Sequence, residues 1–316
     1  MTRPVLLDTD LGSDVDDAIA LALLMACPEL RLVAVTTVAA DVRGRAWAAA
    51  RLLGLGGRSE VEVCAGASEA LVRTGRFVWR EIETEGYPSG PDAKLSDEPA
   101  AERIVRAARE TPGLELVAIG PLTNLAHALA LDPKLPRRVA RLHVMGGHIR
   151  RVAIGTRVCE PGIDYNLCSD PEASAMVLGA GFATRLVTAD VTLETWLRES
   201  DLARLEAARS PVVRALVPLI RLWTPWQRRI FVEQLGGSLA SDNVAFLHDP
   251  LTVLALVDES ALCFETLRIV PCIVDGVFRT FEVATGVSAG ALMEVATGVD
   301  AAAAREAMLA RLLSAR

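Results

Sequence analysis

The sequence predicts an α/β fold with a mostly parallel, doubly wound central sheet and helices on both of its faces, in a single domain over residues 1–316. Short runs of Val, Ile and Leu alternate along the chain with segments of helical length and helical apolar spacing. These runs are continuous, as in parallel strands that are buried on both faces. Apolar residues make up 51% of the 316 residues, enough for a large core, and no linker, repeat or low-complexity segment divides the chain.

Strands and helices alternate through the first two thirds of the chain. Strands are expected where Val, Leu and Ile run together, over residues 4–10, 31–38, 61–66, 114–120, 141–147 and 184–190. Helices are expected where apolar residues recur at helical spacing, over residues 16–26, 43–54, 99–110, 122–131 and 170–181. Pro28 should end the first helix and Gly54 should close the second. Right-handed crossovers between the parallel strands follow.

The last third of the chain changes character. Residues 199–234 are expected to be entirely helical, residues 267–286 to form two or three strands, and residues 301–313 to form the final helix. One long connection stands out earlier. Residues 76–97 are polar and rich in turn formers, which is typical of a loop that forms a lid.

Composition excludes several classes of protein. The net charge is −7 and no block is rich in Lys or Arg, which argues against nucleic acid or an anionic membrane as a partner. No apolar run reaches membrane-spanning length, and the first residues do not resemble a signal peptide. The six cysteines show no CxxC spacing and lie mostly in apolar stretches. We expect reduced thiols in a cytoplasmic protein.

Five aspartates crowd into the stretch LLDTDLGSDVDDAIALALL, residues 6–24, at positions 8, 10, 14, 16 and 17. Helix N-capping explains one or two of them, because carboxylates suit the positive end of a helix dipole. It does not explain five, and Asp8 and Asp10 lie at the end of a strand. Since like charges repel and hard oxygen ligands suit Ca²⁺ or Mg²⁺, the cluster indicates a metal site.

Further candidates follow the other strands. In sheets of this kind ligands bind at the carboxyl ends of the strands. The residues in those positions are Asp8 and Asp10, Asp41, Gly120, Gly146 and Gly147, His148, and Asp190. The sequence therefore places a candidate site along one edge of the sheet.

Several segments together resemble the inosine-uridine-preferring nucleoside hydrolases. The segments are DTDLGSDVDDAIAL near the start, VAIGPLTNLAHAL at 117–129, VMGG at 144–147, DYNLCSDPEA at 164–173 and HDP at 248–250. They arrive in the family's order and extend over nearly the whole chain, down to the final strand and helix. The resemblance implies hydrolysis of the N-glycosidic bond of ribonucleosides to free base and pentose, through a transition state with oxocarbenium character on the sugar.

The resemblance also implies a bound Ca²⁺ that holds the sugar 2′- and 3′-hydroxyls and the attacking water. Its implied ligands are Asp10, Asp17, Asp249 and the backbone carbonyl of Ile119. Asp10 would also be the general base for the water. His248 precedes Asp249, and an imidazole has an ordinary pKa suited to proton donation near neutral pH, so we expect it to assist departure of the base.

The implied sugar contacts depart from the family's usual pattern. They are Asp14 or Asp16, Asp41, Met145, Asp164 and Asn166. Aligning the first motif on its helix makes Asp16 the sugar ligand, whereas aligning it on Gly12 selects Asp14. The family more often has Asn in place of Asp41 and Glu-Phe-Asn in place of residues 164–166, and residues 150–163 offer no Asn. A modified or different pentoside therefore remains an alternative substrate.

Trp223 and Trp226 admit two interpretations. Paired aromatics in a helix usually pack against the core, but the resemblance implies aromatics from this region against the nucleobase. Among the histidines, we expect His127 to be a helix residue of the core or surface and His143 to be structural, while His148 could lie near the site. Asp170 precedes a proline and is expected to cap a helix.

Two other functions stay open at this point. A phosphatase of the haloacid-dehalogenase type also carries a DxD after its first strand and binds Mg²⁺, but it leaves GPLTN and HDP unexplained. A catalytically silent nucleoside- or pentose-binding protein could share this fold, since fold does not determine function. The expected partner is a small-molecule nucleoside, and the family analogy implies a homodimer or homotetramer.

Overall fold

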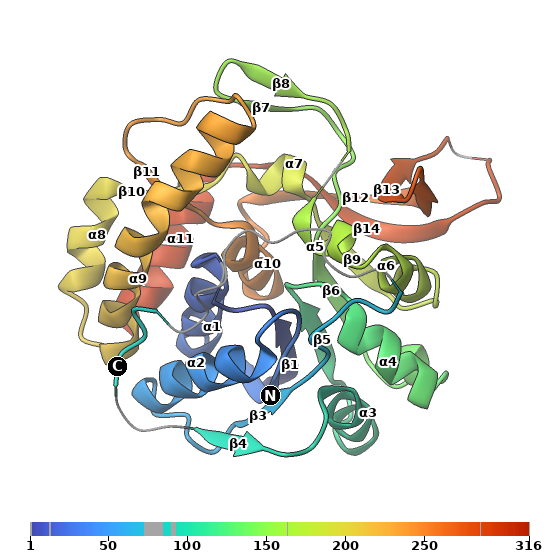
Figure 1. Cartoon of the computed structure of the whole chain (residues 1–316), viewed down its shortest axis with the longest axis horizontal. Coiled ribbons are helices and arrows are strands. Elements are labelled where there is room, and N and C mark those ends of the chain that lie inside the picture. The colour runs from blue at the N-terminus through green and yellow to red at the C-terminus, as the bar shows by residue number, and fades with distance from the viewer. Residues whose placement is uncertain are drawn as a thin grey trace.

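The computed structural model describes residues 2–12, 14–72, 85–89, 93–162, 164–284 and 286–315. Its centre is a ten-stranded sheet with the strand order β13-β12-β14-β9-β6-β5-β1-β2-β3-β4 (Figure 1). The strands are β1 (Arg3–Thr9), β2 (Leu30–Thr37), β3 (Glu62–Ala65), β4 (Lys94–Ser96), β5 (Glu115–Ala118), β6 (Arg141–Met145), β9 (Thr184–Val187), β12 (Leu262–Val274), β13 (Val277–Glu282) and β14 (Ala291–Val299).

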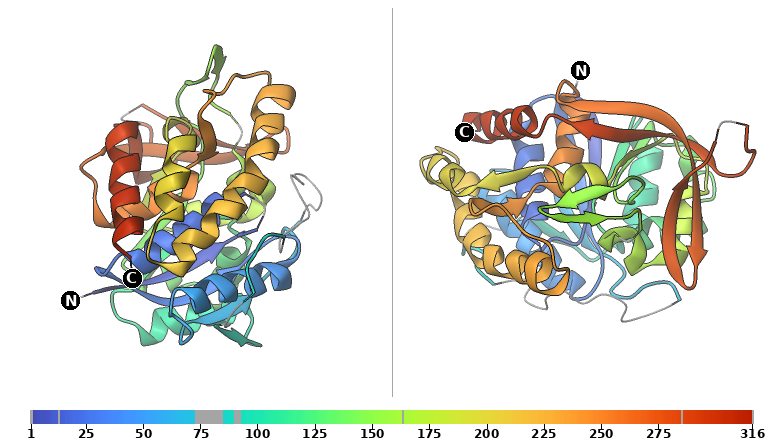
Figure 2. Two further views of the ribbon diagram at one scale, coloured as in Figure 1. Left: turned by 90° about the vertical axis from the view of Figure 1, so that its left-hand side faces the viewer. Right: turned by 90° about the horizontal axis from the view of Figure 1, so that it is seen from above.

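The sheet is mostly parallel, as the sequence predicts. From β14 to β4 every neighbouring pair of strands is parallel, and only β12 and β13 at one edge run antiparallel to their neighbours. Figure 2 shows these long edge strands extending away from the rest of the sheet. The parallel part is buried because helices cover both of its faces.

Two groups of helices form two apolar cores, one on each face of the sheet. One group comprises α1 (Asp16–Ala26), α2 (Val42–Leu55), α8 (Glu199–Glu206), α9 (Pro211–Arg228), α10 (His248–Val257) and α11 (Ala301–Ser314). The other comprises α3 (Ala100–Glu110), α4 (Thr123–Leu131) and α6 (Pro171–Leu178). In Figure 1, α8, α9 and α11 lie on the opposite side of the sheet from α3, α4 and α6.

Strand β1 is central, and its register brings the candidate residues together. Leu7 pairs with Val35 of β2 and with Val117 of β5, and all three side chains are fully buried. One residue further along, Asp8 lies beside Thr36. The carboxyl ends of β1, β2 and β5 are therefore level, and the segments that follow them meet at one edge of the sheet.

The differences from the expected elements concern short strands and one helix end. Two small antiparallel strand pairs were not predicted: β7 (Val152–Ile154) with β8 (Arg157–Cys159), and β10 (Trp196–Arg198) with β11 (Asn243–Phe246). The placement of the second helix end was wrong, since α2 passes through Gly54 and ends at Leu55, with Gly56 as its C-cap. Burial of the α2 face outweighs the weak helix propensity of a single glycine.

The segment 199–234 is helical as predicted, except for residues 207–210, which connect two helices. Helices α8 and α9 are followed by a π-helical turn, Arg229–Gln234, four residues after Pro225. Pro225 has no N–H to donate to the preceding turn, and the chain continues past it in helical conformation into the π-helical turn.

The expected lid at 76–97 lies partly outside the described residues, which omit 73–84 and 90–92. Of the rest, residues 94–96 form β4, so this part of the segment belongs to the sheet. Gly86 lies against α9, because a Cβ there would be 2.4 Å from Leu222 Cδ1.

Within the described part of the chain, no helix has both the length and the apolarity needed to cross a bilayer. Each of the six cysteines lies in that part and is a free thiol, as expected.

Candidate active site

The site lies where β1 and β11 lead into the helices α1 and α10, which pack against each other. The start of α1 supplies Asp16 and Asp17, and the start of α10 supplies Asp249. These two helix starts are 233 positions apart along the chain, measured from Asp16 to Asp249. Strand β1 belongs to the ten-stranded sheet and β11 to the separate β10-β11 pair, so the packing of α10 against α1 is what brings the two helix starts together.

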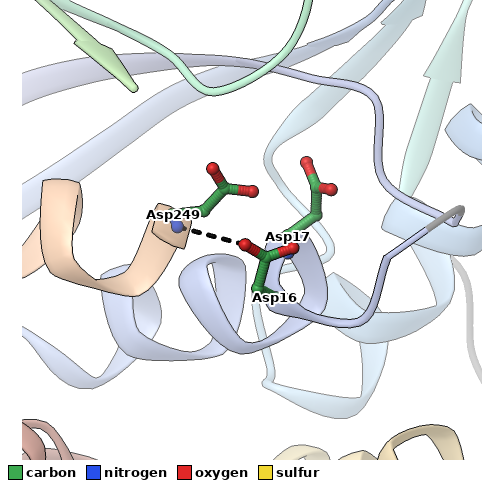
Figure 3. A group of neighbouring side chains, drawn as sticks. All are labelled: Asp16, Asp17 and Asp249. Carbon is green, nitrogen blue, oxygen red and sulfur yellow. Dashed lines mark hydrogen bonds between the residues drawn. The ribbon is translucent and has the colours of Figure 1, made fainter. Parts of the chain in front are cut away.

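Asp16, Asp17 and Asp249 converge on one point. Each offers a carboxylate oxygen, the three oxygens lie within 4.8 Å of one another, and all three residues are buried. In Figure 3 the carboxylates of Asp17 and Asp249 point to the same side, and that of Asp16 lies between the two helix starts. Three buried acidic oxygens at this spacing suit a hard divalent cation.

Two of the three carboxylates, those of Asp16 and Asp17, accept hydrogen bonds from neighbouring groups. Asp16 accepts from the backbone N–H of Asp17 at 3.1 Å and from the backbone N–H of Asp249 at 3.2 Å, so it ties the two helix starts together. The Thr9 hydroxyl donates to Oδ1 of Asp17. Gly120 makes room for Asp10, because a Cβ at Gly120 would lie 2.7 Å from Asp10 Oδ1.

The aspartates repel one another and are cut off from water. Burial raises the pKa of Asp10 to about 6 and that of Asp14 to about 8. Burial, reinforced by the neighbouring carboxylates, holds the pKa values of Asp16, Asp17 and Asp249 well above their usual range. A divalent cation among these groups would reverse the effect, because it favours the ionised form of each.

A second set of predicted residues lies at the ends of β5 and β6. The Asn166 side-chain amide donates to the backbone carbonyl of Ile119 at 2.9 Å and to that of Met145 at 3.2 Å. Asn166 belongs to the short helix α5 (Tyr165–Ser169), whose N-cap, Asp164, accepts from the N–H of Leu167 at 2.9 Å. The structure thus brings Ile119, Met145 and Asn166 into direct contact.

Comparison with known proteins decides the family. The family model described as "Inosine-uridine preferring nucleoside hydrolase" matches residues 5–306. The chain belongs to this family. It is 32% identical over 272 residues to the "Pyrimidine-specific ribonucleoside hydrolase RihA" of Citrobacter koseri, a match that covers 81% of this chain and 80% of the relative. The protein of the same name from Shewanella woodyi is 31% identical over 265 residues, with 81% and 80% covered.

Solved structures agree with this assignment. The structure described as "Plant nucleoside hydrolase - PpNRh1 enzyme" superimposes with a TM-score of 0.81 at 26% identity, covering 99% of this chain and 100% of that chain. The "Purine-Preferring Ribonucleoside Hydrolase from Gardnerella vaginalis" has the same fold, with a TM-score of 0.81 at 24% identity and 98% of each chain covered. The chain is thus an enzyme of the N-glycosyl hydrolase type, and the haloacid-dehalogenase alternative is excluded.

In this nucleoside hydrolase, His248 lies next in sequence to Asp249 of the acidic cluster. His248 is half-buried at the start of α10, directly before Asp249. Its Nδ1 lies 2.6 Å from the hydroxyl of Thr192, and its ring lies 5.3 Å from that of Phe246. Burial lowers the pKa of His248 to about 4, so the imidazole is neutral at neutral pH.

The two tryptophans of α9 lie in different surroundings. Trp223 is 4% exposed and belongs to the apolar core, which is the packing interpretation of this residue. Trp226 is only partly buried, and the guanidinium of Arg229 lies 5.5 Å from the centre of its ring. Of the pair, Trp226 is therefore the one with ring surface that a ligand could reach.

Other predicted residues take structural positions. Asp41 is exposed, and its carboxylate caps α2 by accepting from the N–H of Gly44 at 2.9 Å. Asp170 caps α6, as expected, and also accepts from the Thr123 hydroxyl at 2.7 Å. His143 is buried and contacts Glu115 at 2.7 Å, near the opposite end of the strands.

The remaining histidines are also placed. His127 is exposed on α4, in agreement with the helix interpretation. His148 is buried, and its backbone N–H donates to the Thr280 hydroxyl at 3.1 Å.

Sequence reasoning missed a residue that connects three strands. The Asn124 amide donates to Asp8 Oδ1 at 2.7 Å and to the carbonyl of Thr37 at 3.0 Å. Its oxygen accepts from the N–H of Ala67 at 2.9 Å. The signal was present, since Asn124 ends the GPLTN motif, but its partners come from three separate segments. Asn124 thereby holds the ends of β1, β2 and β3 together beside the site.

Proposed function

We propose that the protein hydrolyses the N-glycosidic bond of ribonucleosides with the help of a Ca²⁺ ion held by the aspartate cluster. The observation that carries the proposal is the convergence of the buried carboxylates of Asp16, Asp17 and Asp249 within 4.8 Å, in a chain of the nucleoside hydrolase family. The family is metal-dependent, and the choice of Ca²⁺ rests on the donor set.

The residues present fit such an ion. Asp10, Asp17, Asp249 and the carbonyl of Ile119 are all hard oxygen donors, the kind that Ca²⁺ prefers. The pKa values of the three aspartates are raised because too little positive charge compensates their burial and mutual repulsion, and a bound cation would supply that charge. When bound, the ion would make a water molecule more acidic and orient the sugar hydroxyls.

Asp10 is proposed as the general base. Its carboxylate takes a proton from the attacking water while the water oxygen forms a bond to C1′ of the sugar. The bond between C1′ and the base nitrogen breaks, and its electron pair leaves with the base. The proton held by Asp10 is then released to solvent, and the departing base gains one, so that protons balance.

The sugar would be held by polar groups around Asp10. Asp16 is supported as the sugar ligand by its place in the cluster. Asp14 is the alternative, and its Oδ1 accepts from the N–H of Val15 at 2.6 Å, just before α1. Asn166, Met145 and Asp164 are proposed to contact the pentose from the ends of β6 and α5. Asp41 would need to leave its capping position on α2 to take part.

His248 is proposed to assist the leaving base. Its Nδ1 is already engaged with Thr192, which leaves Nε2 as the ring nitrogen available to a ligand. If the Thr192 hydroxyl donates to Nδ1, Nε2 carries the hydrogen and can donate to a nitrogen or oxygen of the base as negative charge develops there. Trp226, with Trp223 behind it, is proposed to lie on the base side of the pocket.

The broader expectations rest on the family resemblance. We propose a small-molecule nucleoside as the substrate, with no nucleic-acid or membrane partner, a homodimer or homotetramer as the assembly, and the cytoplasm as the location. The single ten-stranded sheet, which draws strands from β1 to β14, supports one domain over residues 1–316.

A panel of nucleosides tests the proposal. The relatives' names make pyrimidine ribonucleosides the first candidates, followed by purine ribonucleosides and nucleosides with modified sugars. Release of reducing sugar from any of these, lost in Asp10→Asn, supports the proposal. Binding of a nucleoside without turnover would instead identify a catalytically silent binding protein.

A further inference from the structure

Thr9, the last residue of β1, contacts the acidic cluster through Asp17. Thr9 follows Asp8 in β1, and alternation along a strand directs its side chain to the opposite face from that of Asp8. That face is covered by α1, whose first turn carries Asp17. Thr9 is fully buried, and its hydroxyl donates to Oδ1 of Asp17.

The direction of this hydrogen bond is determined by the surroundings. The backbone N–H of Leu11 donates to the Thr9 hydroxyl oxygen at 3.1 Å, so that oxygen is the acceptor there. A hydroxyl has a single hydrogen, and an ionised carboxylate can only accept. The hydrogen of the Thr9 hydroxyl therefore points at Asp17. The hydrogen bond from the N–H of Leu11 holds the hydroxyl oxygen in this orientation.

The carboxylates of Asp16 and Asp17 differ in the number of hydrogen-bond donors that hold them. Asp16 is held by two backbone N–H groups, at 3.1 and 3.2 Å. Within the part of the chain that the structure describes, Thr9 is the sole hydrogen-bond donor found for the Asp17 carboxylate. Without it, the Asp17 side chain would be free to rotate among like charges that repel it.

We propose that Thr9 is a positioning residue that fixes the Asp17 carboxylate through Oδ1, so that its second oxygen, Oδ2, would be left to bind the cation. The inference rests on the proposed Ca²⁺ site and names a residue that acts through a ligand. Hydrogen bonds to ligating carboxylates orient them, and their removal typically lowers metal affinity or activity by about 10- to 100-fold.

Substitutions at Thr9 and at a matched position test this role. Thr9→Val keeps the shape and removes the hydroxyl, Thr9→Ser restores it, and Thr9→Ala also removes the hydroxyl should valine prevent folding. Thr36→Val is the control, because Thr36 is also fully buried and its hydroxyl donates to an aspartate, Asp8, at 2.6 Å. Asp8 is not one of the proposed ligands.

The measurement is Ca²⁺ binding by calorimetry to protein freed of metal with a chelator, together with the melting temperature of the metal-free protein. We expect the Ca²⁺ dissociation constant to rise by about 10- to 100-fold in Thr9→Val and to return to near the wild-type value in Thr9→Ser. Thr36→Val should lower the melting temperature and leave the dissociation constant unchanged.

Two results would overturn the inference while leaving the proposed function intact. One is wild-type Ca²⁺ affinity in Thr9→Val, or in Thr9→Ala if valine does not fold. The other is an equal loss of affinity in Thr9→Val and Thr36→Val, which would show that Thr9 only joins β1 to α1. A wild-type protein that binds no divalent cation would instead overturn the proposed metal site, and this inference with it.

Discussion

Removal of the cation should destabilise the protein by an amount that grows with pH. Asp10 is 4% exposed, and in the metal-free protein burial raises its pKa from 3.8 to about 6. A carboxyl whose pKa is raised on folding contributes stability below the unfolded pKa and loses it as pH rises to the folded value. The window for Asp10 is therefore from about pH 4 to about pH 6.

The size of the effect follows from the shift. A change of roughly 2 pKa units corresponds to about 3 kcal/mol of unfolding free energy, lost by the metal-free protein at neutral pH from Asp10 alone. For large domains 1 kcal/mol changes the melting temperature by roughly 2–4 °C, so the expected difference is on the order of 5 °C or more. The Ca²⁺-bound protein should keep this unfolding free energy at neutral pH, because the ion stabilises the ionised form of the carboxylates.

Thermal unfolding with excess Ca²⁺ and with excess chelator, at pH 5 and at pH 7.5, provides the test. The gap between the two melting temperatures should be wider at pH 7.5. Calorimetric titration near pH 6 should also show proton release on Ca²⁺ binding, seen as a dependence of the heat on the buffer. An equal gap at both pH values, with no proton release, would refute the electrostatic account of the cluster.

Four substitutions make further predictions. Asp10→Asn should lower kcat by at least about a hundredfold with a smaller change in KM, and a loss of only a few-fold would place the base elsewhere. His248→Ala should slow inosine hydrolysis by about two to four orders of magnitude and leave 4-nitrophenyl riboside nearly unaffected, whereas equal losses would show a purely geometric role. Asp249→Ala should abolish Ca²⁺ binding while the circular dichroism spectrum stays native, and retained binding would remove Asp249 from the ligand set. Trp226→Phe should abolish the fluorescence response to a nucleoside analogue, and an unchanged response would place Trp226 outside the pocket.

The parallel part of the sheet was predictable because its longer strands have a clear sequence signal. β1, β2, β5 and β6 are runs of apolar residues buried on both faces, so composition alone indicates them. The short strands could not be predicted. β7, β8 and β10 have three residues each, which is too few to show the alternation of apolar and polar residues that identifies a strand. β4 is equally short and lies inside a segment whose composition is that of a loop.

The candidate site was predictable in part. Physical reasoning from the sequence placed the first aspartates at a strand end and suggested a cation, but nothing in spacing connects Asp249 to Asp17. The family resemblance made that connection, and the packing of α10 on α1 supplies its physical reason. The positions of Thr9 and Asn124 could not be foreseen, because each depends on hydrogen bonds between segments that only the folded topology brings together.

The central claim is that the aspartate cluster holds the cation on which nucleoside hydrolysis depends. Its most direct test is to titrate Ca²⁺ into metal-free protein while following both bound ion and hydrolysis of a nucleoside identified by the substrate panel. The account predicts that hydrolysis rises in step with occupancy of a single site per chain and disappears with excess chelator. Full turnover in strong chelator, by protein that metal analysis finds free of divalent ions, would contradict it.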